Sequence, residues 1–215
     1  MSSQSNSVGT IQNIWRYAVK SMGGEELNEA LVIDGGLLGD RGYAVIDQAS
    51  GKVGSAKMPK KWSSLLTLNS AYSAPPRAGA PLPPVQINWP GGDSVISGTD
   101  DTDARLSETV GRPVTLTTVR PETVSLERID PLVAEEIILD IGEIMMEGRF
   151  SDYAAIHMLT TSTLAHLSKL SPGIAFDAMR FRPNLIIEAA DGHSGFVEND
   201  WVGRTVAIGQ DGRLR

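Results

Sequence analysis

Two arginines and an asparagine crowd the start of an apolar run near the end of the chain. Arg180, Arg182 and Asn184 stand in the stretch "RFRPN", directly before the apolar residues 185–187. A guanidinium binds phosphate through a planar fork of N–H donors, and a carboxamide adds a donor and an acceptor. Pro183 disfavours helix at the preceding residue, so Arg182 is expected to lie in an extended, rigid stretch. The pattern indicates a site for an anion.

Two further basic clusters follow predicted strands in the first half of the chain. Lys20 and Ser21 stand between the apolar stretch 10–19 and Gly23-Gly24, and Arg41 follows a glycine-rich turn. A single Lys or Arg is more often solvated or ion-paired than functional. Three clusters at strand ends together favour a binding site, because sites gather at the mouths of barrels. Their donors suit an anion that carries phosphate and heteroaromatic acceptors.

Composition excludes several classes of function. The 215 residues carry a formal net charge of −7, which argues against general nucleic-acid binding. No apolar run approaches the roughly 20 residues that span a bilayer, and the polar start lacks the apolar centre of a secretion signal. We therefore expect a cytoplasmic protein that binds neither nucleic acid nor membrane. The absence of cysteine excludes disulfides, thiolate metal sites and a cysteine nucleophile within this chain.

The elements that must position these residues are mostly short strands. Alternating and β-branched patterns predict strands at 10–19, 30–33, 43–47, 64–69, 113–119, 184–189 and 205–209, and a hairpin at 85–89 and 93–97. Two helices are expected at 100–111, capped by Asp100, and at 161–170, capped by Thr161 or Ser162.

Two parts of the chain are harder to assign. The acidic span 122–147 is interpreted as a crossing region with a short helix at 132–138. The last residues, 205–215, are typical of a hairpin that ends within its return strand. Because such a strand is a poor natural terminus, we expect the sequence to be truncated. The predicted fold class is mixed α/β and β-rich: a barrel-like core, a β-rich N-terminal half and a few short helices.

Five segments in order carry a resemblance to one family. They are "IWRYAVKSM" (14–22), "GLLGDRGYAVID" (36–47), "SDYAAIHMLTTSTLAHL" (151–167), "RFRPNLIIE" (180–188) and "GFVENDWVGRTVAIG" (195–209). Along nearly its full length the chain resembles the MOSC proteins, the molybdenum cofactor sulfurase C-terminal domain family, although Ala18 stands where that family usually has proline. The resemblance implies a MOSC N-terminal β-barrel domain over 8–120 and an incomplete MOSC barrel over 121–215.

The resemblance also implies a cofactor site for molybdopterin. Its residues, carried over by position, are Lys20, Ser21 and Arg41 from the N-terminal part and Thr160, Thr161, Arg180, Arg182 and Asn184 from the barrel. Arg180 has the alternative of pairing with an acidic neighbour. His157 either orients groups by hydrogen bonds or is structural, Asp152 is expected to position a loop, and Trp201 to pack in the core.

The implied activity is that of a molybdenum-dependent oxidoreductase of the amidoxime-reducing component type. Such a protein reduces N-hydroxylated compounds with electrons from a redox partner or a fused redox domain; the other family activity is handling of cofactor sulfur. Pyridoxal phosphate binding belongs to related sulfurases, but the chain has no room for their several-hundred-residue lyase domain.

The chain departs from the family at the metal. The family binds molybdenum through a cysteine, which this sequence lacks, so no metal ligand and no catalytic residue is assigned. The alternative is a non-catalytic module that binds or carries molybdopterin. An unrelated β-barrel with structural basic residues is the third hypothesis, and it leaves the ordered segments unexplained.

Overall fold

The chain folds into many short strands and a few short helices. The computed structural model describes residues 7–99, 101–121, 125–130, 137–142, 149–209 and 212–214. Over these residues the α-helices are α1 (Pro59–Trp62), α2 (Asp101–Val110) and α3 (Thr161–Leu170), and the 3-10 helices are η1 (Ser63–Thr67), η2 (Ala178–Arg180) and η3 (Val197–Trp201). The strands are β1 (Gly9–Arg16), β2 (Glu25–Leu27), β3 (Val32–Ile33), β4 (Gly36–Leu37), β5 (Ala44–Asp47), β6 (Asn69–Tyr72), β7 (Val85–Asn88), β8 (Ser94–Ile96), β9 (Val114–Thr117), β10 (Ser125–Ile129), β11 (Ile138–Gly142), β12 (Met158–Thr160), β13 (Leu185–Ala189), β14 (Val206–Ile208) and β15 (Gly212–Leu214).

The mixed, strand-rich fold class is confirmed, but the expected closed barrel is not found. The described strands form six separate sheets of two to four strands, and none of these closes on itself. A barrel needs every strand paired on both edges. The expected cap Asp100 and the helix expected at 132–138, as far as residue 136, lie outside the described residues; the last residue expected in that helix, Ile138, begins strand β11 instead.

Two compact units are built from interleaved segments of the chain. The terminal unit comprises the described residues within Met1–Trp15, Glu26–Val32 and Ile156–Arg215. The internal unit comprises those within Arg16–Glu25 and Ile33–Ala155. The division into domains 8–120 and 121–215 stays a prediction.

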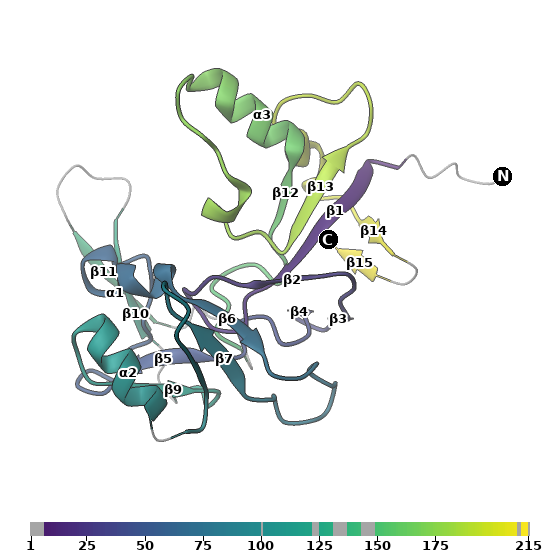
Figure 1. Ribbon diagram of the computed structural model, residues 1–215. Coiled ribbons are helices and arrows are strands. Elements are labelled where there is room, and N and C mark those ends of the chain that lie inside the picture. The colour runs from purple at the N-terminus through teal and green to yellow at the C-terminus, as the bar shows by residue number, and fades with distance from the viewer. Residues whose placement is uncertain are drawn as a thin grey trace. The chain divides into compact units, whose positions relative to one another are not determined.

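The terminal unit is centred on a four-stranded sheet in the order β12-β13-β1-β2 (Figure 1). β13 pairs antiparallel with β1 and parallel with β12. The parallel pair needs a crossover, and α3 supplies it between β12 and β13. The apolar residues Leu185, Ile186 and Ile187 are all buried, as expected of a central strand. β14 and β15 form the expected hairpin near the end of the chain.

The internal unit contains the three-stranded meander β6-β7-β8 and the antiparallel pairs β5-β9 and β10-β11. The predicted hairpin at 85–89 and 93–97 is confirmed as β7 and β8. Helix α2 packs against β9, where Ser107 Oγ accepts a hydrogen bond of 2.9 Å from the Val114 N–H. The helix predicted from periodicity is therefore fixed by its tertiary contact as well as by its own pattern.

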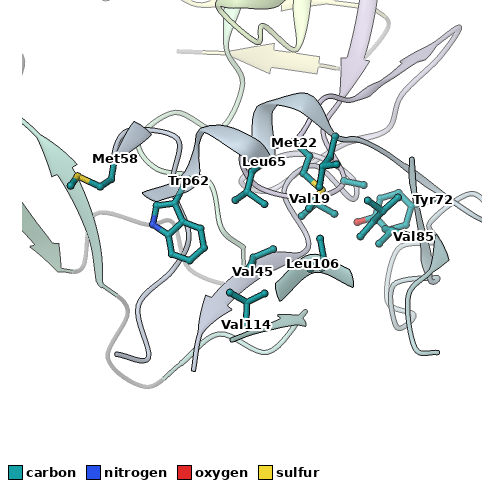
Figure 2. Packing of buried hydrophobic residues seen from close by; sticks show 13 residues of the cluster. Val19, Met22, Val45, Met58, Trp62, Leu65, Tyr72, Val85, Leu106 and Val114 are labelled. Atoms are coloured by element: carbon teal, nitrogen blue, oxygen red, sulfur yellow. The ribbon is translucent and has the colours of Figure 1, made fainter. Parts of the chain in front are cut away.

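A continuous apolar core fills the internal unit. Val19, Val45, Trp62, Leu106 and Val114 come from five elements or turns and converge in Figure 2. Each such side chain contributes about 1.5–3 kcal/mol on burial. The core is completed by Ala18, Met22, Met58, Leu65, Leu68, Tyr72, Val85 and Ile87.

The strand predicted at 64–69 is wrong. Residues 63–67 form the 3-10 helix η1, and β6 begins only at Asn69. Leu65 and Leu68 are fully buried while Leu66 is 49% exposed. Buried residues three apart fit one face of a helical turn, whereas a strand would bury every second residue. A short apolar run satisfies both patterns in sequence.

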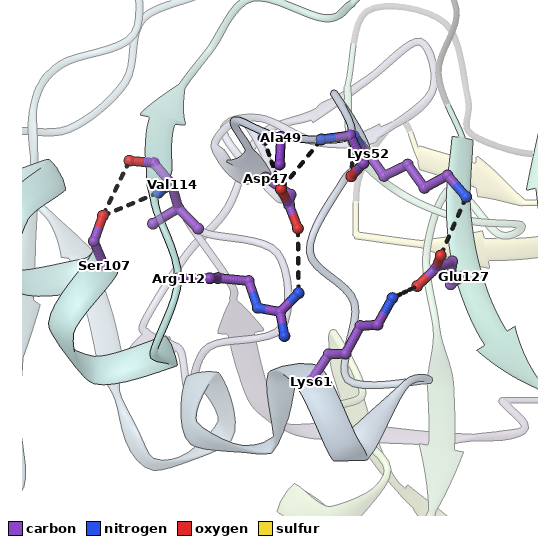
Figure 3. A network of polar contacts seen from close by, with 9 residues as sticks. Asp47, Ala49, Lys52, Lys61, Ser107, Arg112, Val114 and Glu127 are labelled. Atoms are coloured by element: carbon purple, nitrogen blue, oxygen red, sulfur yellow. Dashed lines mark hydrogen bonds and ion pairs between the residues drawn. The ribbon is translucent and has the colours of Figure 1, made fainter.

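Ion pairs tie loops to strands at the edge of this core (Figure 3). Asp47 at the end of β5 accepts hydrogen bonds from the N–H groups of Ala49 and Ser50, at 2.9 and 3.2 Å, and lies 3.3 Å from Arg112. Glu127 on β10 pairs with Lys61 and, at 3.2 Å, with Lys52. These carboxylates hold loop and helix residues against β5 and β10.

Candidate functional site

The eight residues predicted to bind the cofactor divide between the two units. Three belong to the internal unit, namely Lys20, Ser21 and Arg41, and five to the terminal unit, namely Thr160, Thr161, Arg180, Arg182 and Asn184. Each group is described within its own unit.

Lys20 is a buried cation in the internal unit. Its side chain is 5% exposed, and its ammonium group donates to the Phe150 carbonyl oxygen at 3.0 Å and pairs with Asp152. Burial lowers the pKa of Lys20 to about 8, against the attraction of Asp152, which raises it. The repulsion from Lys57 and Arg41 lowers it further. Lys20 is thus a charged donor at neutral pH that loses its proton more easily than an exposed lysine.

Ser21 directly follows this lysine and has a left-handed backbone, with φ of 67°. Its hydroxyl accepts a hydrogen bond from the Ala56 N–H at 3.0 Å, so the loop before α1 holds it in place. The hydroxyl oxygen therefore accepts one hydrogen bond, and the hydroxyl group can still donate its own proton.

Arg41 also has a left-handed backbone, with φ of 49°. Its guanidinium pairs with Asp40 and lies over the ring of Tyr17, 4.6 Å from the ring centre. The backbone holds it from both sides, since its N–H donates to the Tyr17 carbonyl and its carbonyl accepts from the Phe150 N–H. The glycine-rich turn before it is required locally, because Gly39 has φ of 80° and packs against Tyr72.

The segment 149–152 closes around these residues and was not predicted from sequence. Phe150 contacts both Lys20 and Arg41 through its backbone, and Asp152 pairs with Lys20 and, at 2.7 Å, with Lys57. Burial would raise the pKa of Asp152, but Lys20 and Lys57 outweigh it and lower the pKa. Asp152 thus positions a lysine, and Lys57 is a further cation beside the predicted set. The only sequence signal for this segment was the family resemblance.

In the terminal unit, Thr160 is engaged by the protein itself. Its hydroxyl caps α3 by accepting from the Thr163 N–H at 3.1 Å, and its own N–H donates to Glu198 at 2.6 Å. Glu198 also accepts from the Thr163 hydroxyl at 2.6 Å. The N-cap is therefore Thr160, one residue before those expected. A carboxylate at this position suits the positive end of the helix dipole.

The remaining predicted residues of the terminal unit differ in their burial and in the hydrogen bonds that they make within the protein. Asn184 is buried, with its amide donating to the Trp15 carbonyl and accepting from the His157 N–H, both at 3.1 Å. Arg180 is exposed and donates to the Ala175 carbonyl at 3.1 Å, and among the described residues it makes no ion pair with an acidic neighbour. Thr161, the first residue of α3, is half-buried.

Arg182 has a left-handed backbone with φ of 53°, so the expected extended conformation is wrong. Its N–H donates to the Met179 carbonyl at 3.2 Å and thereby closes the turn that begins in η2. That turn imposes the strained conformation before Pro183. Its side chain is half-buried.

Two cavities lie elsewhere in the units. One of about 560 Å³ in the internal unit is lined by residues such as Tyr43, Thr102 and Asp103. The other, of about 880 Å³ in the terminal unit, is lined by residues such as Trp201 and Arg204, so Trp201 borders a cavity and is only half-buried. None of the eight predicted residues lines either cavity.

The described part of the chain has no cluster of three or more His, Asp or Glu side chains that could hold a metal ion. Nor does any helix within it have the length and apolar character needed to cross a membrane.

Comparison with known proteins gives a match to one family model. Residues 8–67 match the family model of the MOSC N-terminal beta barrel domain, which includes Lys20, Ser21 and Arg41. A search of curated proteins found no match.

Proposed function

We propose that the chain binds the molybdenum cofactor through the phosphate and pterin of molybdopterin, because residues 8–67 match the MOSC N-terminal beta barrel domain. In the internal unit the proposed ligands are Lys20, Ser21 and Arg41; for the five residues of the terminal unit, cofactor binding stays a prediction from the resemblance. Lys20 and Arg41 supply positive charge for the phosphate, and Ser21 supplies a hydroxyl donor.

One observation carries the proposal. Among the described residues, three that are not glycine have a positive φ: Ser21, Arg41 and Arg182. All three belong to the predicted set of eight, although they come from segments far apart in the sequence. A left-handed backbone costs such residues about 1–3 kcal/mol each and gathers at sites where a ligand must be held. This coincidence supports binding more strongly than the charges alone.

The residues fit the organic part of the cofactor better than its metal. The buried ammonium of Lys20 and the half-buried guanidinium of Arg41 suit a phosphate, whereas Asn184 and Thr160 already use their polar groups inside the terminal unit. No cysteine occurs in the chain, so the thiolate expected for molybdenum is missing from it. When bound, the cofactor supplies oxo transfer, which in the amidoxime-reducing type reduces N-hydroxylated substrates with electrons from a redox partner.

The missing thiolate favours a second candidate, a module that binds or carries molybdopterin without catalysis. Both candidates share the same phosphate and pterin contacts. They differ in whether molybdenum is held in stoichiometric amount, so elemental analysis beside pterin content separates them.

The binding proposal is tested by pterin retention. The protein is produced in a host that makes the cofactor, and its pterin content is measured by fluorescence after oxidation. We expect Lys20→Ala and Arg182→Ala each to lower retention by about tenfold, because each removes a hydrogen bond to a charged group. Circular dichroism shows whether the variants keep their fold.

Arg77→Ala and Lys169→Ala are matched controls, since both side chains are exposed and stand outside the predicted set. They should retain pterin like the unaltered protein. Unchanged retention in both test variants, or no pterin in the unaltered protein, would contradict the proposal.

A further inference from the structure

Arg149 is a buried cation without a close anionic partner among the described residues of the internal unit. The residue is 9% exposed, and its Nη1 has no hydrogen-bond partner among the described residues. Its guanidinium lies against the turn at Gly35 and Gly36. A Cβ on Gly36 would stand 2.7 Å from Nη1, so the turn makes room for the guanidinium only because it lacks side chains.

The nearest carboxylate is already in use. Asp40 attracts Arg149, but one of its oxygens accepts from the Tyr17 N–H at 2.9 Å and the other pairs with Arg41. Burial lowers the pKa of Arg149, and the neighbouring charge of Arg41 lowers it further. A buried charge without a close partner is costly to a fold, and such a group persists where a ligand completes it.

Ser151 is a second unsatisfied group in the same segment. It is 2% exposed, and its Oγ has no hydrogen-bond partner among the described residues. The residues on either side of it, Phe150 and Asp152, both contact the Lys20 ammonium. The segment that contacts Lys20 and Arg41 thus contains a buried donor, Ser151, and a buried cation, Arg149.

The local charge balance is positive. Lys20, Arg41, Lys57 and Arg149 interact electrostatically with one another or with the two carboxylates Asp40 and Asp152. Among the described residues, these four cations outnumber the two carboxylates by two charges, in a chain whose formal net charge is −7. A tetrahedral dianion is the ligand that matches both the excess charge and the unused N–H and O–H donors.

We propose that Arg149 and Ser151 bind an oxyanion of the phosphate class in the internal unit, together with Lys20 and Arg41. Arg149 and Ser151 lie outside both the predicted set and the family match at 8–67. The oxyanion site is inferred from these contacts alone, whereas its assignment to the phosphate of molybdopterin rests on the proposed function.

The test uses the full chain, produced without cofactor, and inorganic phosphate as the probe. Calorimetry measures the phosphate Kd of the unaltered protein, Arg149→Met, Ser151→Ala and the exposed control Arg77→Met. We expect Arg149→Met to weaken binding by at least about tenfold and Ser151→Ala by about fivefold, since a charged donor is worth more than a neutral one. Arg77→Met should bind like the unaltered protein.

Thermal unfolding without phosphate separates a binding role from a structural one. Methionine keeps most of the volume of Arg149 and removes the unpaired charge, so Arg149→Met should have a Tm equal to or above that of the unaltered protein. A clearly lower Tm would show that Arg149 supports the fold and would overturn the proposal. So would a phosphate Kd unchanged in both Arg149→Met and Ser151→Ala, or an unaltered protein that binds no phosphate.

A last arm identifies the source of the anion. Protein that retains pterin should bind inorganic phosphate only after the pterin is released, if one site serves both. Phosphate binding without any pterin retention would support the oxyanion site while the proposed function fails. Simultaneous binding of both would overturn the assignment to the cofactor phosphate.

Discussion

The internal unit holds its cationic residues by contacts with the backbone. Lys20 donates to one carbonyl of the segment 149–152, and Arg41 is fixed by hydrogen bonds of its own N–H and carbonyl. Ser21 is fixed through its hydroxyl. A donor held in this way loses little further freedom when an anion binds, which lowers the entropic cost of binding.

The pKa of Lys20 predicts how anion binding depends on pH. The ammonium is charged below about pH 8 and neutral above it, whereas an exposed lysine stays charged up to its ordinary value of 10.5. Binding of a dianion by this group should therefore weaken as the pH rises through about 8. Sulfate is the appropriate ligand, because its own charge does not change between about pH 6 and pH 10. Calorimetry across that range measures the effect.

Lys20→Arg is the matched variant for this measurement. Arginine stays protonated throughout the range, so the loss of affinity near pH 8 should disappear while binding at pH 7 is kept. Asp152, Lys57 and Arg41 all act on Lys20 and remain in the variant. An unaltered protein whose sulfate affinity stays level from pH 7 to about pH 10 would show that Lys20 does not contact the anion.

Only part of the candidate site could be predicted from sequence. The resemblance identified Lys20, Ser21 and Arg41, but their left-handed backbones are not visible in residue types. Arg149 carried no signal and Ser151 only that of the family resemblance, because Phe150 between them is held by contacts with Lys20 and Arg41, more than 100 positions away. A sequence pattern reports local preference, whereas an unsatisfied donor is a property of the assembled unit.

Among the elements, those with a strong pattern and a local cap were predicted well. Helix α3 has the predicted bounds Thr161–Leu170, and the hairpin of β7 and β8 formed around the expected Pro-Gly-Gly turn. The strand predicted at 64–69 failed because an apolar run of that length fits a helical turn as well as a strand. Tertiary packing of Leu65 and Leu68 decided between them.

Asn184 shows why the ends of elements matter to the site. Its side chain joins the Trp15 carbonyl on β1 to the His157 N–H just before β12, so it fastens three segments of the terminal unit. We expect Asn184→Ala to lower the free energy of unfolding by about 1–3 kcal/mol, because it leaves two half-buried backbone groups without the partner that the amide supplies. Urea unfolding measures the change.

The exposed amide Gln12 is the matched control for Asn184. It lies on β1 of the same unit and donates to Glu188 at 3.3 Å on the surface. Gln12→Ala should change stability by less than about 0.5 kcal/mol. If Asn184→Ala unfolds at the same urea concentration as the unaltered protein, the amide is free to serve the ligand and its structural role is refuted.

At the scale of the whole molecule, sequence patterns could not show that the units interleave. The terminal unit takes residues from the beginning and from the end of the chain. The chain passes from one unit to the other within β1, β2 and β3. Hydrophobic periodicity reports elements but not which elements share a core. The sequence could therefore predict the mixed, strand-rich class, but not which strands belong to the same unit.

The two units should respond differently to acid. Burial alone would raise the pKa of Asp47, but hydrogen bonds from Ala49 and Ser50 and the charge of Arg112 outweigh it and lower the pKa. Lys61 and Lys52 lower the pKa of Glu127, and the pKa of Asp152 is lowered as well. All three carboxylates belong to the internal unit.

A carboxyl whose pKa is lower in the folded than in the unfolded state stabilises the fold above its unfolded value, here 3.8 for Asp and 4.5 for Glu. That stability is lost as the pH falls through the folded pKa. The internal unit should therefore lose stability below about pH 4. Its tryptophans, Trp62 and Trp89, report this by fluorescence once Trp15 and Trp201 of the terminal unit are replaced by Phe.

Asp47→Asn tests the cause. Asparagine cannot carry the charge that pairs with Arg112, so at pH 7 the variant should be less stable by about 1–3 kcal/mol. Below the folded pKa of Asp47 the unaltered protein carries a neutral group there too, so the difference should shrink as the pH falls. Asp93→Asn is the control, because Asp93 pairs with Arg105 at 3.3 Å but its side chain is 79% exposed. A constant difference between Asp47→Asn and the unaltered protein from pH 7 to about pH 2 would mean that shape, and not charge, is what Asp47 contributes.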